Sequence, residues 1–264
     1  MASELHKILI LHGHGQSAEI IKPKTRYVRE VFRTLSDDIQ FEFQFLSGVL
    51  PAYPDEDDNK DQKVWGHGEP EHDKIRGLEK SLEHIFNTLD EDGPFSGIIG
   101  FSSGAAMAAI VASLLEKRKT LCGIPWKARH LKLRFVICLS GFQLGNKCYE
   151  AFYYPKIATP TFHTFGTLDE TVTPAQTAGL AKQCAYAYSF GFFGGHYVPQ
   201  SKEYMSFRQS LERFLKKVLG MPAQVHESCA GIDVVGEKDK AQRAISSFSY
   251  VPHGVPTGIE VLAR

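Results

Sequence analysis

The chain lacks any hydrophobic run long enough to cross a bilayer. Its longest apolar stretch, residues 105–115, has 11 residues and contains a serine, whereas a spanning helix needs about 20 residues. The chain also lacks an excess of charge of either sign, because 30 Lys and Arg residues balance 30 Asp and Glu residues. These two absences predict that neither a membrane nor a nucleic acid is a partner of this protein.

Cysteine is scarce, and its spacing follows no metal-binding or disulfide pattern. The five cysteines form no C-x-x-C pair, which predicts reduced thiols and no zinc site. His12 interrupts the N-terminal apolar run too early for a secretory signal, and the C-terminal Leu262-Ala263-Arg264 is not a peroxisomal address. We therefore expect a cytoplasmic protein with free thiols at Cys122, Cys138, Cys148, Cys184 and Cys229.

The sequence does contain a regular alternation of short apolar runs with amphipathic helical stretches. Runs such as residues 7–11 (KILIL) are typical of strands buried on both faces. The alternation predicts an α/β fold, with a mostly parallel central sheet of about six strands flanked by helices. The 264 residues, 43% of them hydrophobic, suit one large domain. We place this domain at residues 1–220, followed by a C-terminal extension at residues 221–264.

The expected elements follow from the spacing of the apolar residues. Residues 47–73 stand outside the alternation as a long acidic loop, and a loop of that length in a compact domain is usually functional or mobile. Strands are expected at residues 7–11, 41–45, 97–101, 135–140, 161–166 and 186–193. Helices are expected at residues 24–35, 75–89, 103–115 and 174–185, and at a last stretch from Phe207 to Val218.

One motif points to nucleophilic catalysis. Residues 100–104 read G-F-S-S-G, a G-x-S-x-G match that lies directly between an expected strand and an expected helix. This is the setting of a nucleophile elbow, in which a tight turn exposes the serine hydroxyl at the edge of the sheet. The other interpretation is a glycine-rich turn with a serine that caps the helix. The context favours Ser102 as the nucleophile.

A serine hydroxyl needs a base, and the base needs an orienting acid. In α/β-hydrolases the chain order is Ser, acid, His. Asp169 and its neighbour Glu170 follow the strand at residues 161–166, and Asp169 is the better placed of the two. His196 follows the last strand after two glycines and is the expected base. His163 lies in mid-strand and is a weaker candidate, and His226 and His253 in the extension have no positional argument.

The same reasoning predicts an oxyanion hole made of backbone N–H groups. One donor is the residue after the nucleophile, Ser103, and the second comes from the loop after the first strand, where we assign His14. In the predicted mechanism Ser102 attacks an ester or thioester carbonyl while His196 takes its proton and Asp169 orients His196. An acyl-enzyme forms, and water then releases the acid.

Taken together, these motifs resemble the FSH-type family of serine hydrolases. The resemblance runs through ILILHGHGQSAEI, GPFSGIIGFSSGAAMAAIVA, LSGF, GTLDETV and FGGHYVP, in the family's order. It implies an α/β-hydrolase fold and the same three residues, Ser102, Asp169 and His196. It also implies that Trp65 and Phe142 line a substrate pocket. The family elbow usually has Gln where this chain has Ser103, and the extension goes past the usual family end.

The resemblance further implies an activity. The family includes esterases and thioesterases that release polyketide chains, so we expect a small-molecule acyl ester or a carrier-bound acyl thioester as substrate, with a polyketide synthase as a possible partner. Two other functions stay open. One is a general carboxylesterase on small esters, and the other is a non-catalytic binding protein with a hydrolase fold.

Three patterns in the sequence match metal or cofactor sites only in part. The acidic run that starts at Asp55 begins like a calcium loop but has Lys60 and Gly66 where glycine and glutamate are required. The cluster of His67, Glu69, Glu71 and His72 matches no standard metal spacing. The glycines after the first strand form only part of a dinucleotide motif. We therefore expect no cofactor and no metal.

Overall fold

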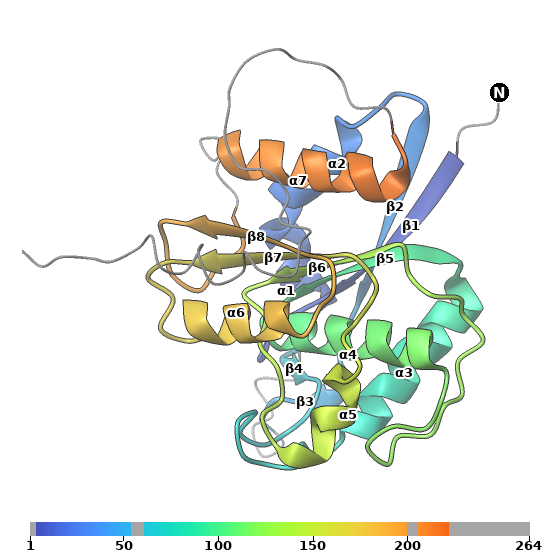
Figure 1. Ribbon diagram of the computed structural model, residues 1–264, viewed down its shortest axis with the longest axis vertical. Coiled ribbons are helices and arrows are strands. Elements are labelled where there is room, and N and C mark those ends of the chain that lie inside the picture. Colours follow the sequence, from blue (N-terminus) through green and yellow to red (C-terminus); the bar gives the residue numbers. More distant parts are fainter. Residues whose placement is uncertain (1–3, 54–60, 200–204, 222–264) are drawn as a thin grey trace, which may run out of the picture. The chain divides into compact units, whose positions relative to one another are not determined.

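The computed structural model describes residues 4–53, 61–199 and 205–221. Its centre is a six-stranded sheet with the order β2-β1-β5-β6-β7-β8, in which all neighbouring strands are parallel (Figure 1). The expected α/β fold with a parallel sheet of about six strands is confirmed. The strands are β1 (Glu4–Leu11), β2 (Ile39–Leu46), β5 (Phe95–Phe101), β6 (Phe135–Leu139), β7 (Thr161–Gly166) and β8 (Ala187–Phe192).

Helices cover both faces of the sheet, as a parallel sheet requires. The helices α3, α4, α5 and α6 lie on one face, and α1, α2 and α7 lie on the other. Each face therefore has its own hydrophobic core. The helices are α1 (Ala18–Lys24), α2 (Arg26–Arg33), α3 (Leu78–Asp92), α4 (Ser103–Lys117), α5 (Glu150–Tyr153), α6 (Pro174–Lys182) and α7 (Met205–Leu219), with a short 3-10 turn η2 at Lys147–Tyr149.

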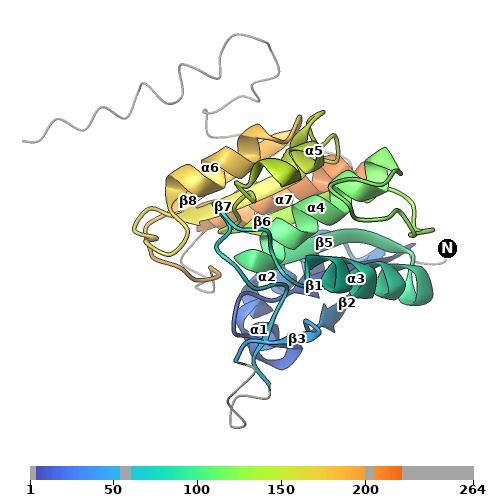
Figure 2. The same cartoon turned by 90° about the horizontal axis from the view of Figure 1, so that it is seen from below.

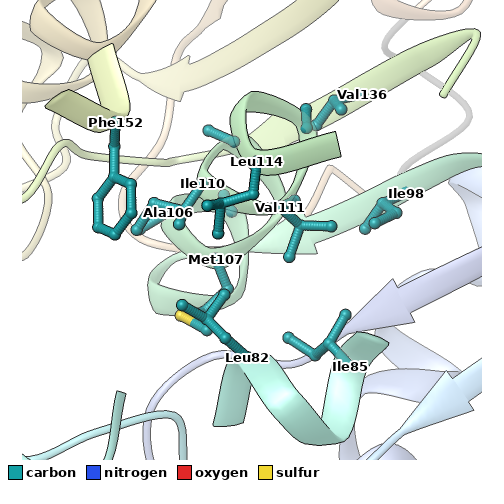
Figure 3. Close-up of a cluster of buried hydrophobic side chains, with 14 of the residues drawn as sticks. Leu82, Ile85, Ile98, Ala106, Met107, Ile110, Val111, Leu114, Val136 and Phe152 are labelled. Atoms are coloured by element: carbon teal, nitrogen blue, oxygen red, sulfur yellow. The ribbon is translucent and has the colours of Figure 1, made fainter. Parts of the chain in front are cut away.

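The central helix α4 carries the larger core. Twelve of its residues are buried, and they form one unbroken run from Gly104 to Leu115, which explains why its sequence is apolar on nearly all sides rather than amphipathic. Figure 3 shows Met107 and Val111 of α4 between the sheet and the α3 residues Leu82 and Ile85. The elbow motif thus leads into a helix that is buried along most of its length, so its first turn is held rigidly.

Several expected boundaries were wrong for local reasons. The expected helix at residues 24–35 is α2, which begins at Arg26. A second helix, α1, was not expected from the sequence, and Thr25 separates the two with a side-chain hydroxyl that donates a hydrogen bond to the carbonyl of Ile21 at 3.1 Å. A polar side chain that bonds to its own backbone in this way weakens a continuous helix. The helix expected from residue 75 begins at Leu78, after Gly77 in a left-handed conformation (φ 81°).

The loop expected at residues 47–73 contains a small two-stranded antiparallel sheet. Its strands are β3 (Leu50–Pro51) and β4 (Lys63–Val64). Residues 54–60, which hold most of the calcium-like run, lie outside the described residues, as does the predicted extension from residue 222 onward. The predicted domain boundary at residues 220 and 221 therefore stays a prediction. No helix in the described part of the chain has the length and hydrophobicity needed to cross a membrane.

Candidate active site at the carboxyl ends of the strands

Ser102 stands on a tight turn between β5 and α4. Its backbone has φ 55° and ψ −120°, a region that side-chain-bearing residues rarely adopt. Two glycines allow this turn to pack. A Cβ atom at Gly100 would lie 2.2 Å from the carbonyl oxygen of Gly104, and one at Gly104 would lie 2.4 Å from that of His12. The N–H of Ser102 donates to the carbonyl of Leu139 at 2.8 Å, which ties the turn to β6.

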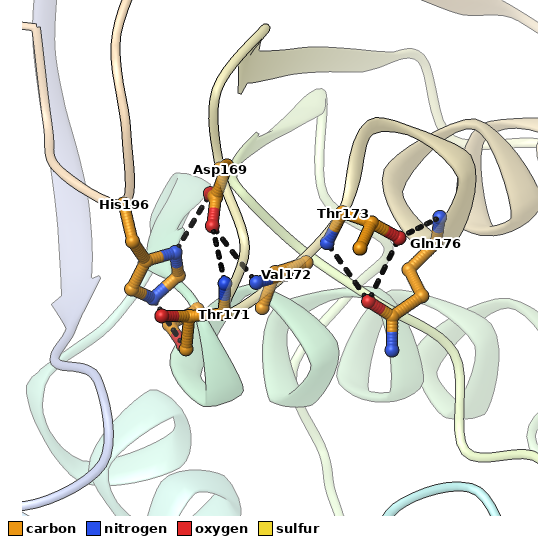
Figure 4. Close-up of polar contacts among 7 residues, drawn as sticks. Asp169, Thr171, Val172, Thr173, Gln176 and His196 are labelled. Carbon is orange, nitrogen blue, oxygen red and sulfur yellow. Dashed lines mark hydrogen bonds and ion pairs between the residues drawn. The ribbon is translucent and has the colours of Figure 1, made fainter. Parts of the chain in front are cut away.

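The structure brings Ser102, His196 and Asp169 into one hydrogen-bonded chain, although they come from three separate loops. His196 Nε2 lies 3.0 Å from Ser102 Oγ, and His196 Nδ1 lies 2.8 Å from Asp169 Oδ2. The side chain of Asp169 is fully buried, and its other carboxylate oxygen accepts the N–H groups of Thr171 and Val172 at 3.0 and 2.8 Å (Figure 4).

This network sets the tautomer of His196. An ionised carboxylate can only accept hydrogen bonds, so Nδ1 of His196 carries the proton that faces Asp169. Nε2 is then left as the acceptor for the hydroxyl of Ser102. The imidazole also lies against the ring of Phe101 at a centroid distance of 4.8 Å, which limits its rotation. The ring is therefore held as a base directed at Ser102.

The two residues predicted to supply the oxyanion hole, His14 and Ser103, line the same cavity as Ser102. Ser103 is the first residue of α4, where backbone N–H groups have no acceptor within the helix. His14 is exposed on the turn after β1. That turn packs closely against the end of β5, because a Cβ atom at Gly13 would lie 2.9 Å from the ring of Phe101. Ser103 Oγ is buried and has no hydrogen-bond partner among the described residues.

His12 is a site residue that the sequence reasoning missed. Its ring is fully buried, with Nδ1 2.7 Å from the carbonyl of Gly13 and Nε2 accepting the N–H of Gly48 at 2.8 Å. Its own carbonyl accepts the indole N–H of Trp65 at 2.8 Å, and the two rings stack at 4.8 Å. His12 therefore joins the turn after β1 to two segments that follow β2. Its place directly after a buried strand was the only available signal.

A cavity of about 330 Å³ lies beside Ser102, at the lower end of the range for small-molecule sites (roughly 300–1,000 Å³). Trp65 and Phe142 both line it. A wider surface depression of about 710 Å³ has neither Ser102 nor His196 in its walls, so the smaller cavity is the relevant one. Its apolar lining consists of Trp65, Pro70, Ile75, Leu78, Ala106, Met107, Ile110, Phe142, Leu144 and Val172, and its polar lining includes His14, Ser102, Ser103, Glu69 and Thr171.

Comparison with known proteins identifies the family. The family model described as Serine hydrolase (FSH1) matches residues 1–208. The chain belongs to this serine hydrolase family. It is therefore a hydrolytic enzyme, as the resemblance in the sequence implied.

Curated relatives of this serine hydrolase carry several names. Esterase OVCA2 of Danio rerio is 28% identical over 235 residues, which cover 80% of this chain and 96% of that protein. Family of serine hydrolases 2 of Saccharomyces cerevisiae is 28% identical and covers 75% and 93%. A protein named dihydrofolate reductase in Schizosaccharomyces pombe is 29% identical over 75% of this chain, but the matched region is only 45% of that protein.

Solved structures support the same fold for this serine hydrolase. Acyl-protein thioesterase 2 of Zea mays superimposes with a TM-score of 0.57 at 19% identity and covers 83% of this chain and 95% of that one. SOBER1 of Arabidopsis thaliana gives a TM-score of 0.52 at 21% identity, with 80% and 100% covered. At these identities the likeness concerns the fold, and it confirms the predicted α/β-hydrolase fold.

The polar residues that were weighed as metal ligands do not form a cluster. Within residues 4–53, 61–199 and 205–221, no three His, Cys, Asp or Glu side chains are placed so that they could hold a metal ion. His67, Glu69, Glu71 and His72 instead belong to the segment that leads from β4 to α3.

We expect this serine hydrolase to lose stability in mild acid because of two buried histidines. Burial lowers the pKa of both His12 and His163 to about 4, whereas histidines in the unfolded chain have a pKa of about 6.5. Because the unfolded chain binds more protons below pH 6.5, the free energy of unfolding is at its full value above that pH. It decreases as the pH falls toward 4, by about 2 kcal/mol per histidine at pH 5.

Urea unfolding at pH 7 and pH 5 measures this loss. His163 serves as the test position because it is buried in β7, away from the Ser102 network. The free energy of unfolding is expected to fall by about 2 kcal/mol less between pH 7 and pH 5 in His163→Phe than in the wild type. An equal loss of unfolding free energy in both proteins would contradict the lowered pKa of His163.

Proposed function

We propose that Ser102, His196 and Asp169 form a catalytic triad that hydrolyses a carboxylic ester or thioester. The observation that carries the proposal is the continuous chain of contacts from Asp169 through the ring of His196 to Ser102, with distances of 2.8 and 3.0 Å. This chain ends at the wall of an apolar cavity. Membership of the serine hydrolase family and the esterase names of several relatives support it.

The mechanism follows from the roles of these atoms. As Ser102 Oγ attacks the acyl carbonyl carbon, its proton passes to Nε2 of His196, and the carboxylate of Asp169 stabilises the resulting cation. The negative charge on the tetrahedral carbonyl oxygen is held by the backbone N–H groups of His14 and Ser103, each worth roughly 3 kcal/mol in the transition state. His196 then protonates the leaving group. Water, deprotonated by His196, attacks the acyl-enzyme and releases the acid.

The cavity supports an acyl chain of medium length as the recognised part of the substrate. At roughly 30 Å³ for one water-sized group, a volume of about 330 Å³ accommodates on the order of ten non-hydrogen atoms. Trp65 and Phe142 supply aromatic walls, and Met107 and Ile110 of α4 supply aliphatic ones. Release of a carrier-bound polyketide from a synthase uses the same acyl chemistry and stays a prediction from the family resemblance.

A series of p-nitrophenyl esters tests this function, with matched acyl thioesters beside them. We expect kcat/KM to rise about threefold per added methylene, because each buried CH₂ contributes up to about 0.8 kcal/mol. The rise is expected to stop near ten carbon atoms, where the cavity is full. Met107→Trp, which fills part of the cavity, is expected to move this optimum to shorter chains while the acetyl ester is still hydrolysed.

Each outcome of this series points to one function. A preference for thioesters favours chain release from a carrier, and a preference for the shortest oxygen esters favours a general carboxylesterase. An optimum that is the same in the wild type and in Met107→Trp contradicts the assigned cavity. Absence of hydrolysis, together with no labelling of Ser102 by a fluorophosphonate probe, indicates a binding protein.

A further inference from the structure

The cavity has one wall that comes from an irregular segment. Residues 66–76 connect β4 to α3 and are called the strap below. Five strap residues line the cavity, namely Gly66, Gly68, Glu69, Pro70 and Ile75. The two ends of the strap are joined by reciprocal backbone hydrogen bonds between His67 and Arg76, at 3.0 and 2.9 Å. The strap is therefore a closed loop, which Figure 2 shows as the teal trace between β3 and α3.

The strap is fastened along one side to the segment that follows β6. The carbonyl of Pro70 accepts the N–H of Gly145 at 2.7 Å, and the carbonyl of His72 accepts the side-chain amide of Asn146 at 2.6 Å. The N–H of Ile75 donates to the hydroxyl of Tyr149 at 2.8 Å. These three bonds all go to residues 145–149, so they hold the strap on the same side of the cavity.

A fourth bond fastens the strap to a different element. The side-chain amide of Gln176, in the first turn of α6, donates to Oε1 of Glu71 at 2.6 Å. Glu71 is exposed and lies near the tip of the strap, and Gln176 follows it by 105 residues. This contact joins the strap to α6, the helix that follows the loop carrying Asp169.

Gln176 is itself fixed. It belongs to a capping box in which its side-chain oxygen accepts the N–H of Thr173 at 2.8 Å and its own N–H donates to the hydroxyl of Thr173 (Figure 4). In the same loop, Asp169 accepts the N–H groups of Thr171 and Val172, and both of these residues line the cavity. The bond from Glu71 therefore ends on a hydrogen-bonded unit that contributes Thr171 and Val172 to the cavity wall.

We propose that the Glu71–Gln176 hydrogen bond is a specificity-determining contact that closes the strap over the acyl cavity. The inference rests on the proposed function, because the acyl chain is what the closed strap contacts. An acetyl group is too small to fill the cavity and gains little from this wall. A decanoyl chain reaches the apolar strap residues Pro70 and Ile75. The contact therefore selects for acyl chains of medium length, such as decanoyl, and adds little to the hydrolysis of short ones.

The variant Gln176→Glu tests this with little effect on α6. A glutamate at this capping-box position keeps the acceptor for the N–H of Thr173, and it suits the positive end of the helix dipole. It also places a carboxylate against that of Glu71, so the bond is lost and the two side chains repel. We expect the ratio of kcat/KM for decanoyl over acetyl p-nitrophenyl ester to fall about tenfold, with most of the change in KM.

The exchanged pair provides the matched control. In Glu71→Gln combined with Gln176→Glu, the amide at position 71 donates to the carboxylate at position 176, so the same bond forms with donor and acceptor reversed. We expect the decanoyl preference to return to within about twofold of the wild type. A wild-type ratio in Gln176→Glu alone overturns the proposal. So does an exchanged pair that stays as defective as the single variant, because the defect would then lie in α6.

A measurement that needs no activity separates this proposal from the proposed function. Hydrogen exchange reports the opening of the strap through the bonded amides of His67, Ile75 and Arg76. We expect these amides to exchange about tenfold faster in Gln176→Glu and at the wild-type rate in the exchanged pair. If no ester is cleaved and Ser102 is not labelled, the proposed function fails. The hydrogen-exchange rates still show whether the Glu71–Gln176 bond holds the strap. Equal exchange rates in the wild type, Gln176→Glu and the exchanged pair contradict the proposed role of the Glu71–Gln176 bond and leave the proposed function unaffected.

Discussion

Replacing Ser102 by alanine is expected to lower kcat by a factor on the order of 10⁴–10⁶. The hydroxyl of Ser102 is the only group of the proposed triad that forms a bond to the acyl carbon, so no acyl-enzyme forms without it. KM is expected to change little, because the cavity walls that bind the acyl chain are retained. The rates are measured on the decanoyl p-nitrophenyl ester, and the burst of p-nitrophenol in the first turnover is expected to disappear.

A second serine provides the control. Ser81 of α3 is fully buried, and its hydroxyl has no hydrogen-bond partner among the described residues. Ser81→Ala is therefore expected to fold and to retain nearly the full rate. A fluorophosphonate probe is expected to label the wild type and Ser81→Ala but not Ser102→Ala. If Ser102→Ala were labelled and active at the wild-type rate, another residue would be the nucleophile.

Replacing Asp169 by asparagine is expected to lower kcat by a factor on the order of 10⁴ while the fold is kept. The N–H groups of Thr171 and Val172 point at one oxygen of Asp169, so the amide oxygen of an asparagine takes that position. Its NH₂ group then faces Nδ1 of His196, which must become an acceptor. The proton moves to Nε2, and this nitrogen can no longer accept the proton of Ser102.

The neighbouring acid distinguishes this explanation from a general loss of charge. Glu170 is exposed and adjacent to Asp169, and Glu170→Gln removes the same charge without altering the tautomer of His196. It is expected to retain the rate within about threefold, since a surface substitution of this kind has small effects. Nitrogen-15 chemical shifts of His196 report the tautomer directly in both variants. A normal tautomer in Asp169→Asn, or a larger loss in Glu170→Gln, would contradict the assignment of Asp169.

Much of the fold could be predicted because its signals are local. Continuous apolar runs such as residues 7–11 and 135–139 identify strands buried on both faces, and five neighbouring pairs in one sheet all proved parallel. The elbow at Ser102 could be found because strand, turn and helix are contiguous in the sequence. The order of motifs along the chain was enough to identify the family, and the family model confirms it. The roles of Asp169 and His196 were predicted from the order of nucleophile, acid and histidine along the chain.

Contacts between distant segments could not be predicted from the sequence. His12 reaches Gly48 and Trp65, which are 36 and 53 residues away, and Gln176 reaches Glu71 across 105 residues. A single sequence has no periodicity that pairs such positions, because each contact depends on how the strands order themselves in the sheet. Helix α1, which Thr25 separates from α2, and the short strands within residues 47–73 were missed for a related reason. There, individual side-chain and backbone hydrogen bonds outweigh the average preference that hydrophobic spacing reports.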